Sequence, residues 1–325
     1  MGNRMSEKLK LFGVVSRAEF ILPNLGSLIL GLAWGANRNL SLTSLILLLV
    51  LSFTIINLSS AIGAQVNTYA DYELDTKDDR KKRLVQAVDS FGKNRLKQSI
   101  IIELICALVL VSTFAYIIGK LVLLLLWIVG ICLGCSYSAP PLRLKARSWL
   151  APASLFLVLA VFPVLFAYYS FTSIIEPLFL VSLAGLTLTV YGVIVPTETR
   201  DYFGDKAMGI ETLTVHLGLE KASFAAIILL ATGAILSAIA FLLKFIYDGH
   251  PLLSLSLILI PVVVIYVLGQ FRTLYRLSSA YVHLGQASVA DEITNLSANN
   301  PRWIMLVTQT YSLISILLLL SKFLL

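Results

Sequence analysis

Residues 43–75, TSLILLLVLSFTIINLSSAIGAQVNTYADYELD, join a long apolar run to a polar, acidic end. The part from 43 to 66 carries no charged side chain and exceeds the ~20 apolar residues that a helix needs to cross the core of a bilayer. If the helix continues past residue 66, Asn67, Asp71 and Asp75 lie along one face, because four residues separate each from the next. The stretch therefore predicts a membrane-spanning helix with carboxylates at one end.

The composition of the chain excludes an ordinary soluble domain. Of its 325 residues, 58% are hydrophobic and 13% are charged, whereas soluble proteins average roughly 45–50% and ~25%. The mean hydropathy is +0.88. We therefore expect an all-α, polytopic membrane protein.

Apolar stretches of sufficient length recur along the chain and predict nine transmembrane helices. They cover approximately residues 18–36, 43–66, 98–117, 119–137, 152–170, 177–197, 223–243, 251–270 and 303–321. We expect one domain over residues 1–325. Within it, two quasi-repeats of four helices, about 18–137 and 152–270, precede a ninth helix at about 303–321.

The distribution of basic residues predicts the orientation in the membrane. Of the 25 lysines and arginines, all but Arg38, Lys120, Lys244 and Lys322 fall in the N-terminal tail or in the loops after the second, fourth, sixth and eighth spans. Because basic residues are enriched in cytoplasmic loops, the N-terminus and the acidic motifs are expected on the cytoplasmic side of the cell membrane. Attraction to anionic lipid also accounts for the net charge of +7, so we expect membrane lipid and no nucleic acid as a partner.

A second acidic cluster follows the sixth predicted span. Glu198, Asp201 and Asp205 are spaced by three and four residues, which again makes one face of a helix. Repeated carboxylates on one face repel one another unless a cation offsets the charge. Mg²⁺ suits such a set, because it prefers oxygen ligands and binds through a few carboxylates together with substrate phosphates. The alternative for either cluster alone is solvated loop charge, which is also the expectation for Asp78, Asp79 and Asp89.

Between the clusters lies YSAPPLRLK, residues 137–145, at the end of the fourth predicted span. The two prolines stop the helix, and Arg143 and Lys145 follow them. Cations at this place can bind diphosphate oxygens and stabilise a leaving group. The alternative is ordinary cytoplasmic loop charge, and the same two interpretations stay open for Arg17.

Three motifs in this order resemble the UbiA superfamily of intramembrane prenyltransferases. They are Asn-x-x-x-Asp-x-x-x-Asp at 67–75, Tyr-Ser-x-Pro-Pro-x-Arg-x-Lys at 137–145, and Asp-x-x-Gly-Asp-Lys-x-x-Gly-x-x-Thr-Leu at 201–213. The resemblance covers nearly the whole chain and implies helices around a central cavity that cytoplasmic loops cap.

The resemblance also implies roles for individual residues. Metal and diphosphate binding would fall to the acidic and amide side chains of both clusters: Asn67, Asp71, Asp75, Asp201 and Asp205, with Glu198 as a further acidic metal ligand. Arg143 and Lys145 would contact the diphosphate, and Tyr137 would lie near the reacting allylic carbon.

Two departures from the superfamily pattern leave the acceptor class open. Many relatives have Asp directly after the motif's Asn, where this chain has Thr68, and residues 82–92 replace a stretch that relatives share. Neither change removes a motif carboxylate.

The predicted function is Mg²⁺-dependent transfer of a prenyl group from an isoprenyl diphosphate to a lipophilic acceptor, an aromatic quinone precursor or a glycerol-phosphate lipid. The protein would supply electrostatic stabilisation, orientation and exclusion of water. The alternative is a cation-coupled transporter that uses the same carboxylates, although transporters favour sites at mid-depth on discontinuous helices.

Two further features carry open interpretations. Glu103 lies about one turn inside the third span, where it would either act on the acceptor or reach back to the cytoplasmic interface. Tyr168, Tyr169 and Tyr191 would either face a carbocation through their rings or simply pack, and we expect packing.

Overall fold

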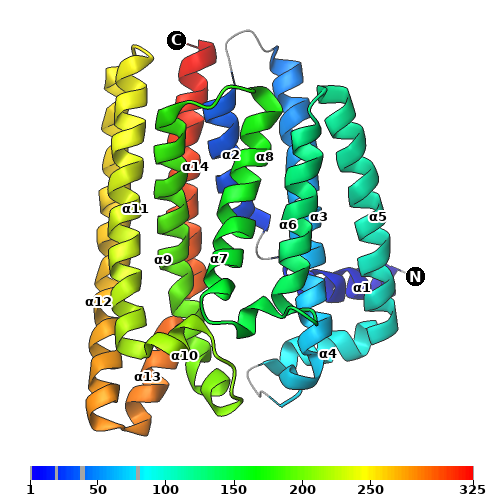
Figure 1. The fold of residues 1–325 in the computed structure, drawn as a ribbon, viewed down its shortest axis with the longest axis vertical. Coiled ribbons are helices and arrows are strands. Elements are labelled where there is room, and N and C mark those ends of the chain that lie inside the picture. Colours follow the sequence, from blue (N-terminus) through cyan, green and yellow to red (C-terminus); the bar gives the residue numbers. More distant parts are fainter. Residues whose placement is uncertain (1, 19–20, 37–40, 78–80, 325) are drawn as a thin grey trace.

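The computed structural model describes residues 2–18, 21–36, 41–77 and 81–324, and every element within these ranges is helical. Arg38, Asp78 and Asp79 lie outside them. The helices run mostly parallel to one another in a single bundle (Figure 1). The prediction of an all-α, polytopic membrane protein is confirmed.

Eight helical stretches in the described ranges are long and apolar enough to cross a membrane. Five are single helices: α3 (Leu42–Asp75), α5 (Lys93–Ile118), α6 (Leu121–Ser138), α9 (Pro177–Ala207) and α11 (Leu219–Tyr247). Three are composite: α7 (Leu150–Phe156) with η4 (Leu157–Val161) and α8 (Phe162–Phe171), η5 (Pro251–Ile258) with α12 (Leu259–Leu284), and α13 (Ala287–Ser297) with α14 (Asn300–Leu324). Each overlaps one of the predicted spans.

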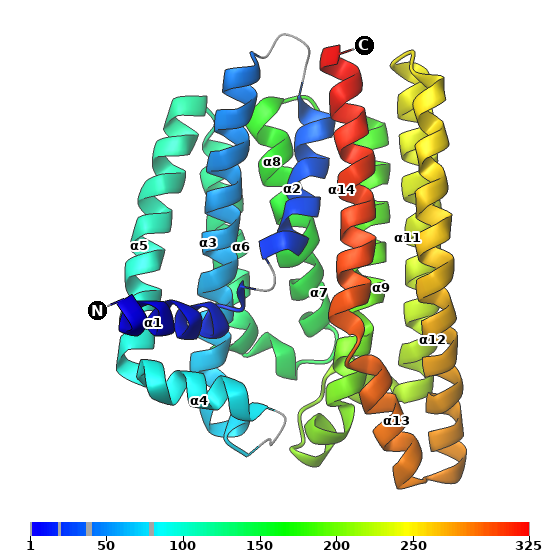
Figure 2. The same cartoon turned by 180° about the vertical axis from the view of Figure 1, so that it is seen from behind.

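The first predicted span, residues 18–36, is shorter than expected. It corresponds to α2 (Ile21–Gly35), which has 15 residues and a length of about 22 Å, whereas the hydrocarbon core is ~30 Å thick. The chain before it turns aside, so that α1 (Gly2–Val15) lies across the bundle instead of along it (Figure 2).

The two largest hydrophobic clusters of the bundle both include residues of α2 and α8. One gathers residues of α9, α11, α12 and α14, and the other gathers residues of α3, α5 and α6. Figure 1 shows the same division, with α8 between the two groups of helices.

Glycines allow the helix backbones to approach closely, as is common where neither water nor bulky side chains separate membrane helices. A Cβ added to Gly192 of α9 would lie 2.8 Å from the backbone nitrogen of Leu230 on α11. On α2, a Cβ at Gly26 would lie 2.8 Å from the carbonyl oxygen of Thr308 on α14. Helix α2 is thus held against a neighbour by backbone contact.

The two acidic clusters lie at the same end of the bundle. Helices α3 and α9 run in the same direction and both end there, next to the short helices α4 (Lys82–Phe91) and α10 (Leu213–Leu217) (Figure 1). Each cluster lies within its helix, so the expected shared faces are formed.

Lysines at the opposite end of the bundle bind helix ends and carboxylates. Lys322 Nζ donates to the carbonyl oxygen of Ala36 at 2.8 Å, and Lys120 Nζ donates to that of Tyr169 at 2.7 Å. Lys244 lies 3.2 Å from carboxylate oxygens of both Glu176 and Asp248. Lys322 and Lys120 therefore satisfy carbonyl groups that the last turns of helices leave without an intrahelical partner.

Candidate active site

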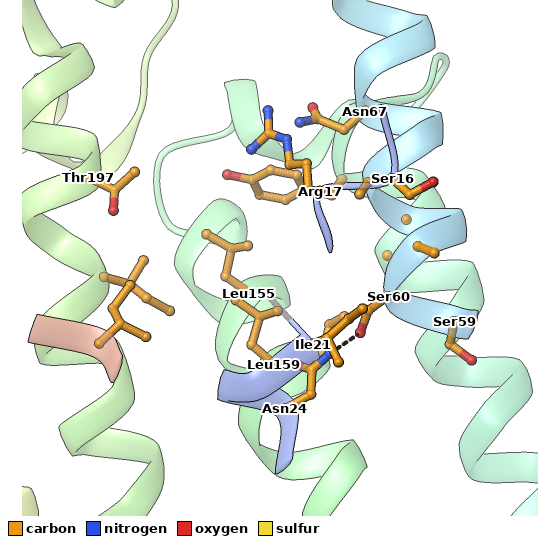
Figure 3. A pocket seen from close by; sticks show the side chains of 18 of the residues that line it. Ser16, Arg17, Ile21, Asn24, Ser59, Ser60, Asn67, Leu155, Leu159 and Thr197 are labelled. Carbon is orange, nitrogen blue, oxygen red and sulfur yellow. Dashed lines mark hydrogen bonds between the residues drawn. The ribbon is translucent and has the colours of Figure 1, made fainter. Parts of the chain in front are cut away.

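A cavity of about 1210 Å³ opens between the two halves of the bundle. Side chains from α2, α3, α6, α7, α8, α9 and α14 line it. Figure 3 looks into it, with Arg17 and Asn67 near one end and Asn24 and Ser60 near the other. The cavity thus has a charged end, where the acidic helices finish, and a deeper, largely apolar part.

The first acidic cluster contributes Asn67 and Asp71 to the cavity wall. Asp71 is buried and accepts a hydrogen bond from Lys145 Nζ, while Arg143 lies 3.6 Å from its other carboxylate oxygen. Asn67 accepts a hydrogen bond from the hydroxyl of Ser138. The cluster and the segment after α6 are therefore joined directly.

Asp75 differs from the two residues before it on the same face. It is buried but does not line the cavity, and its carboxylate pairs with Lys81 at 2.7 Å. Lys81 itself lines the cavity. Asp75 is therefore joined to the cavity wall through Lys81.

The second acidic cluster places all three of its carboxylates on the cavity wall. Glu198 is buried and accepts hydrogen bonds from the backbone N–H and the hydroxyl of Thr214, at 3.3 and 3.0 Å. Asp201 accepts two hydrogen bonds from Arg200, at 3.0 and 3.1 Å. The hydrogen bonds between Glu198 and Thr214 hold α10 against the end of α9.

The segment after α6 turns its basic residues back toward Asp71. Arg143 has a φ of 41°, which is unusual for a residue with a side chain, and Lys145 lies in the short 3-10 turn η3 (Leu144–Ala146). Burial lowers the pKa of the Lys145 ammonium, and the Asp71 carboxylate opposes that shift. Tyr137, at the end of α6, lines the cavity.

The donor chemistry of the charged end fits a hard divalent cation. Its ligand groups are carboxylate and amide oxygens on two facing helices, and Oδ1 of Asp71 is buried without a hydrogen-bond partner. In the part of the chain that the structure describes, no three His, Cys, Asp or Glu side chains are grouped closely enough to hold one ion. Asp71 and Asp201 instead pair with neighbouring basic side chains.

Sequence reasoning missed several cavity residues. Lys81, Arg200 and Arg302 line the charged end, and only Arg200 had a local signal, because it lies inside the second acidic motif. Asn24 and Asn57 line the deeper part. The sequence signal that could have found these two residues is an isolated amide side chain within an apolar span.

Glu103 does not line the cavity. Its Oε1 accepts hydrogen bonds from Gln65 Nε2 at 2.8 Å and from Ser99 Oγ at 2.7 Å, and Gln65 also donates to Ser16 Oγ at 2.9 Å. Because buried polar groups require partners, this network fixes the turn between α1 and α2 against α3 and α5.

Arg17 lies in that turn, with a φ of 48° and with its side chain on the cavity wall. Figure 3 shows it at the same end of the cavity as Asn67. Non-glycine residues in this backbone region persist where the surrounding structure holds them, often at functional sites. The network around Glu103 provides that support.

The three tyrosines considered for cation stabilisation are absent from the cavity wall. The ring of Tyr168 stacks on Phe179 with 3.7 Å between centroids, and its hydroxyl donates to the carbonyl oxygen of Ile174. Tyr169 packs edge-on against Tyr168. The expectation that these rings serve packing agrees with these contacts.

Thr68, which stands where many relatives have Asp, packs against α1. Its side chain is buried, and the hydroxyl donates to the carbonyl oxygen of Val15 at 3.5 Å. It therefore faces α1 and not the cavity.

Comparison with known proteins identifies the family. Residues 24–283 match the sequence model of the UbiA prenyltransferase family, so this chain belongs to that family. No curated protein matches the sequence significantly.

Solved structures share the fold. A UbiA homologue from Archaeoglobus fulgidus bound to GPP and Mg²⁺ is 18% identical, with a TM-score of 0.61 over 92% of this chain and 99% of that one. A structure described as digeranylgeranylglyceryl phosphate synthase is 19% identical, with a TM-score of 0.60 over 95% and 99%. The apo form of a homologue from Aeropyrum pernix K1 is 17% identical, with a TM-score of 0.57 over 89% and 96%.

Proposed function

We propose that this protein transfers a prenyl group from an allylic isoprenyl diphosphate to a lipophilic acceptor and releases diphosphate, with Mg²⁺ as cofactor. Membership of the UbiA prenyltransferase family supports the reaction class. The observation that carries the proposal is the charged end of the cavity, where acidic residues of α3 and α9 face each other above an apolar interior. The A. fulgidus homologue bound to GPP and Mg²⁺ supports the choice of ligands.

Asn67, Asp71, Asp201 and Asp205 would hold Mg²⁺ and through it the diphosphate, with Glu198 and Asp75 as further acidic groups. Bound Mg²⁺ supplies positive charge that stabilises the departing diphosphate. Lys145, Arg143 and Arg17 bind diphosphate oxygens and add to that stabilisation. Metal binding by Asp71 and Asp201 would release the basic side chains that now pair with them, Lys145 and Arg143 from Asp71 and Arg200 from Asp201, so that these cations become available to the diphosphate.

The reaction breaks the bond between the allylic carbon and the diphosphate oxygen, and the oxygen keeps the electron pair. A nucleophilic carbon or oxygen of the acceptor then forms a bond to the allylic carbon, and the acceptor loses a proton. Tyr137 lines the cavity beside the charged end, and its ring stabilises positive charge on the allylic carbon. The apolar part of the cavity takes the hydrocarbon tail and keeps water away from the carbocation.

We also propose that the charged end faces the cytoplasm. The enrichment of lysine and arginine in the loops at that end supports this orientation. The rival interpretation, a cation-coupled transporter, is less well supported, because the acidic residues lie at one end of continuous helices and not at mid-depth.

The direct test uses purified protein in lipid nanodiscs with Mg²⁺, labelled C10–C20 prenyl diphosphates and a panel of acceptors. We expect labelled product and stoichiometric diphosphate, both abolished by chelation of Mg²⁺ and by Asp71→Asn or Asp201→Asn. Glu73→Gln is the matched control, since Glu73 lies on α3 with an 88% exposed side chain. Full activity of the Asp71 and Asp201 variants would refute the proposal, and cation transport into liposomes without turnover would favour the rival.

A further inference from the structure

The deeper part of the cavity contains a cluster of uncharged polar side chains, with which a hydrocarbon tail can form no hydrogen bonds. Asn24 of α2 donates hydrogen bonds through Nδ2 to Asn57 Oδ1 at 3.1 Å and to Ser60 Oγ at 2.9 Å, both on α3 (Figure 3). Asn24 is only 8% exposed, and all three residues line the cavity. We refer to Asn24, Asn57 and Ser60 as the amide patch.

The orientation of both amides follows from their hydrogen bonds. Asn57 Nδ2 donates to the carbonyl oxygen of Phe53 at 2.9 Å, so its Oδ1 must face Asn24 and must accept. Asn24 therefore presents Nδ2 to α3. The groups left without a protein partner in the described ranges are Oδ1 of Asn24, the hydroxyl hydrogen of Ser60 and the second Nδ2 hydrogen of Asn57. The patch thus offers one acceptor and two donors.

The wall formed by α6, η4 and α8 has the opposite character. It presents Leu126, Ile131, Val158 and Phe162 to the cavity. A hydrocarbon tail fits this wall, whereas a tail laid on the amide patch would deprive its donors and acceptor of partners, at a cost of about 1–3 kcal/mol per group. The apolar wall therefore suits the prenyl tail better than the amide patch does.

No charge lies within the amide patch. The acidic and basic residues of the cavity wall that the structure describes belong to the charged end, and Arg17, which precedes α2, lies near Asn67 (Figure 3). Ser60 precedes Asn67 by seven residues on α3, which corresponds to about 10 Å along the helix. An acceptor can therefore touch the patch while its nucleophilic atom lies near the carbon attached to the diphosphate.

We propose that the amide patch is the acceptor subsite and that it selects an acceptor with an uncharged hydroxyl or carbonyl group. A carboxylate or phosphate would meet no cation there and would lose its hydration without compensation. This inference rests on the proposed function and narrows its substrate class.

The test measures KM for each substrate separately in Asn24→Leu and Ser60→Ala. The acceptors are hydroquinone and menadiol as uncharged compounds, and 4-hydroxybenzoate and a glycerol-phosphate lipid as charged ones. We expect turnover of an uncharged acceptor, with its KM raised about tenfold in either variant and with KM for the prenyl diphosphate changed less than twofold. Ser60→Ala removes a single oxygen, so it serves if Asn24→Leu fails to fold.

Ser223→Ala is the control for a merely structural role. It breaks a 3.0 Å hydrogen bond between Ser223 and Ser278, which joins α11 to α12 away from the cavity. If the amide patch only joins helices, Asn24→Leu will resemble Ser223→Ala, with a lower Tm and an unchanged acceptor KM, and the inference is wrong. It is equally wrong if a charged acceptor is preferred. Absence of diphosphate release from the unmodified protein with every acceptor would instead count against the proposed function.

Discussion

Lys145 donates a hydrogen bond to Oδ2 of Asp71, although 74 residues separate them in the chain. Arg143 approaches the other oxygen of the same carboxylate. The fold thus neutralises the central acidic residue of α3 with the two cations assigned to the diphosphate. Under the proposed function, binding of metal and substrate at this place would replace these ion pairs by contacts of Asp71 with Mg²⁺ and of Lys145 and Arg143 with the diphosphate.

This pairing predicts strong coupling between Asp71 and Lys145. Removal of either partner leaves the other charge buried and uncompensated. The loss of stability in the double variant Asp71→Asn with Lys145→Met should therefore be smaller than the sum of the losses in the two single variants. We expect a coupling free energy of about 1–3 kcal/mol, measured by denaturation of all four proteins in detergent without Mg²⁺. Each single variant should also lower kcat/KM at least about 100-fold. Simple additivity in stability would contradict the pairing.

Gly63 predicts a way to block the cavity without disturbing the fold. It lies one turn before Asn67 on the cavity wall, and a Cβ built there meets no atom within 4 Å. Gly63→Phe should lower turnover at least about tenfold while Tm stays equal or rises slightly, because glycine in a helix costs ~0.5–1 kcal/mol relative to alanine. Gly269→Phe is the control, since Gly269 on α12 also has open space but does not line the cavity. Unimpaired turnover in Gly63→Phe would show that substrates do not pass α3 here.

The network around Glu103 predicts an effect on Arg17. Glu103→Ala removes the acceptor for Gln65 and Ser99, which loosens the turn that carries Arg17. We expect KM for the prenyl diphosphate to rise about tenfold, the effect of one lost hydrogen bond of ~1.4 kcal/mol, with a smaller change in acceptor KM. Glu103→Gln keeps an oxygen at this place and should restore most of the affinity. If kcat falls while both KM values stay constant, Glu103 acts in another way.

Lys322 should matter for stability and not for catalysis. Its ammonium donates to the carbonyl oxygens of Trp34 and Ala36 at the end of α2, and hydrogen bonds to charged groups contribute ~1.5–3 kcal/mol. Lys322→Met should therefore lower Tm by several degrees while the turnover per folded molecule stays constant. Lys97→Met is the control, because Lys97 is exposed and its substitution should leave Tm unchanged. A selective loss of turnover would contradict a purely structural role.

The sequence predicted the features that depend on local pattern. The spacing of Asn67, Asp71 and Asp75 required only that α3 continue as a helix, and it does. The lengths of the apolar runs likewise predicted the eight helical stretches that are long and apolar enough to cross a membrane. These features depend on helical periodicity and on the thickness of the bilayer, both of which can be read from neighbouring residues.

Other features depend on tertiary contacts that neighbouring residues do not encode. The bond between Lys145 and Asp71 requires the path of the chain after α6, and the pairing of Asp75 with Lys81 withdraws one motif residue from the cavity. The hydrogen bonds of Glu103 could not be predicted either, because its partners Gln65 and Ser99 lie on two different helices. The turn at Arg17 depends on the same contacts.

The contact of Lys322 with the end of α2 has a consequence for biogenesis. Helix α2 leaves the ribosome before α14, which supplies Lys322 and the backbone against which Gly26 packs. Until α14 has been translated and inserted, α2 lacks these partners, and the cavity lacks the wall that α14 contributes. A variant that lacks α14 would therefore insert most of its other helices and still hold no finished binding site.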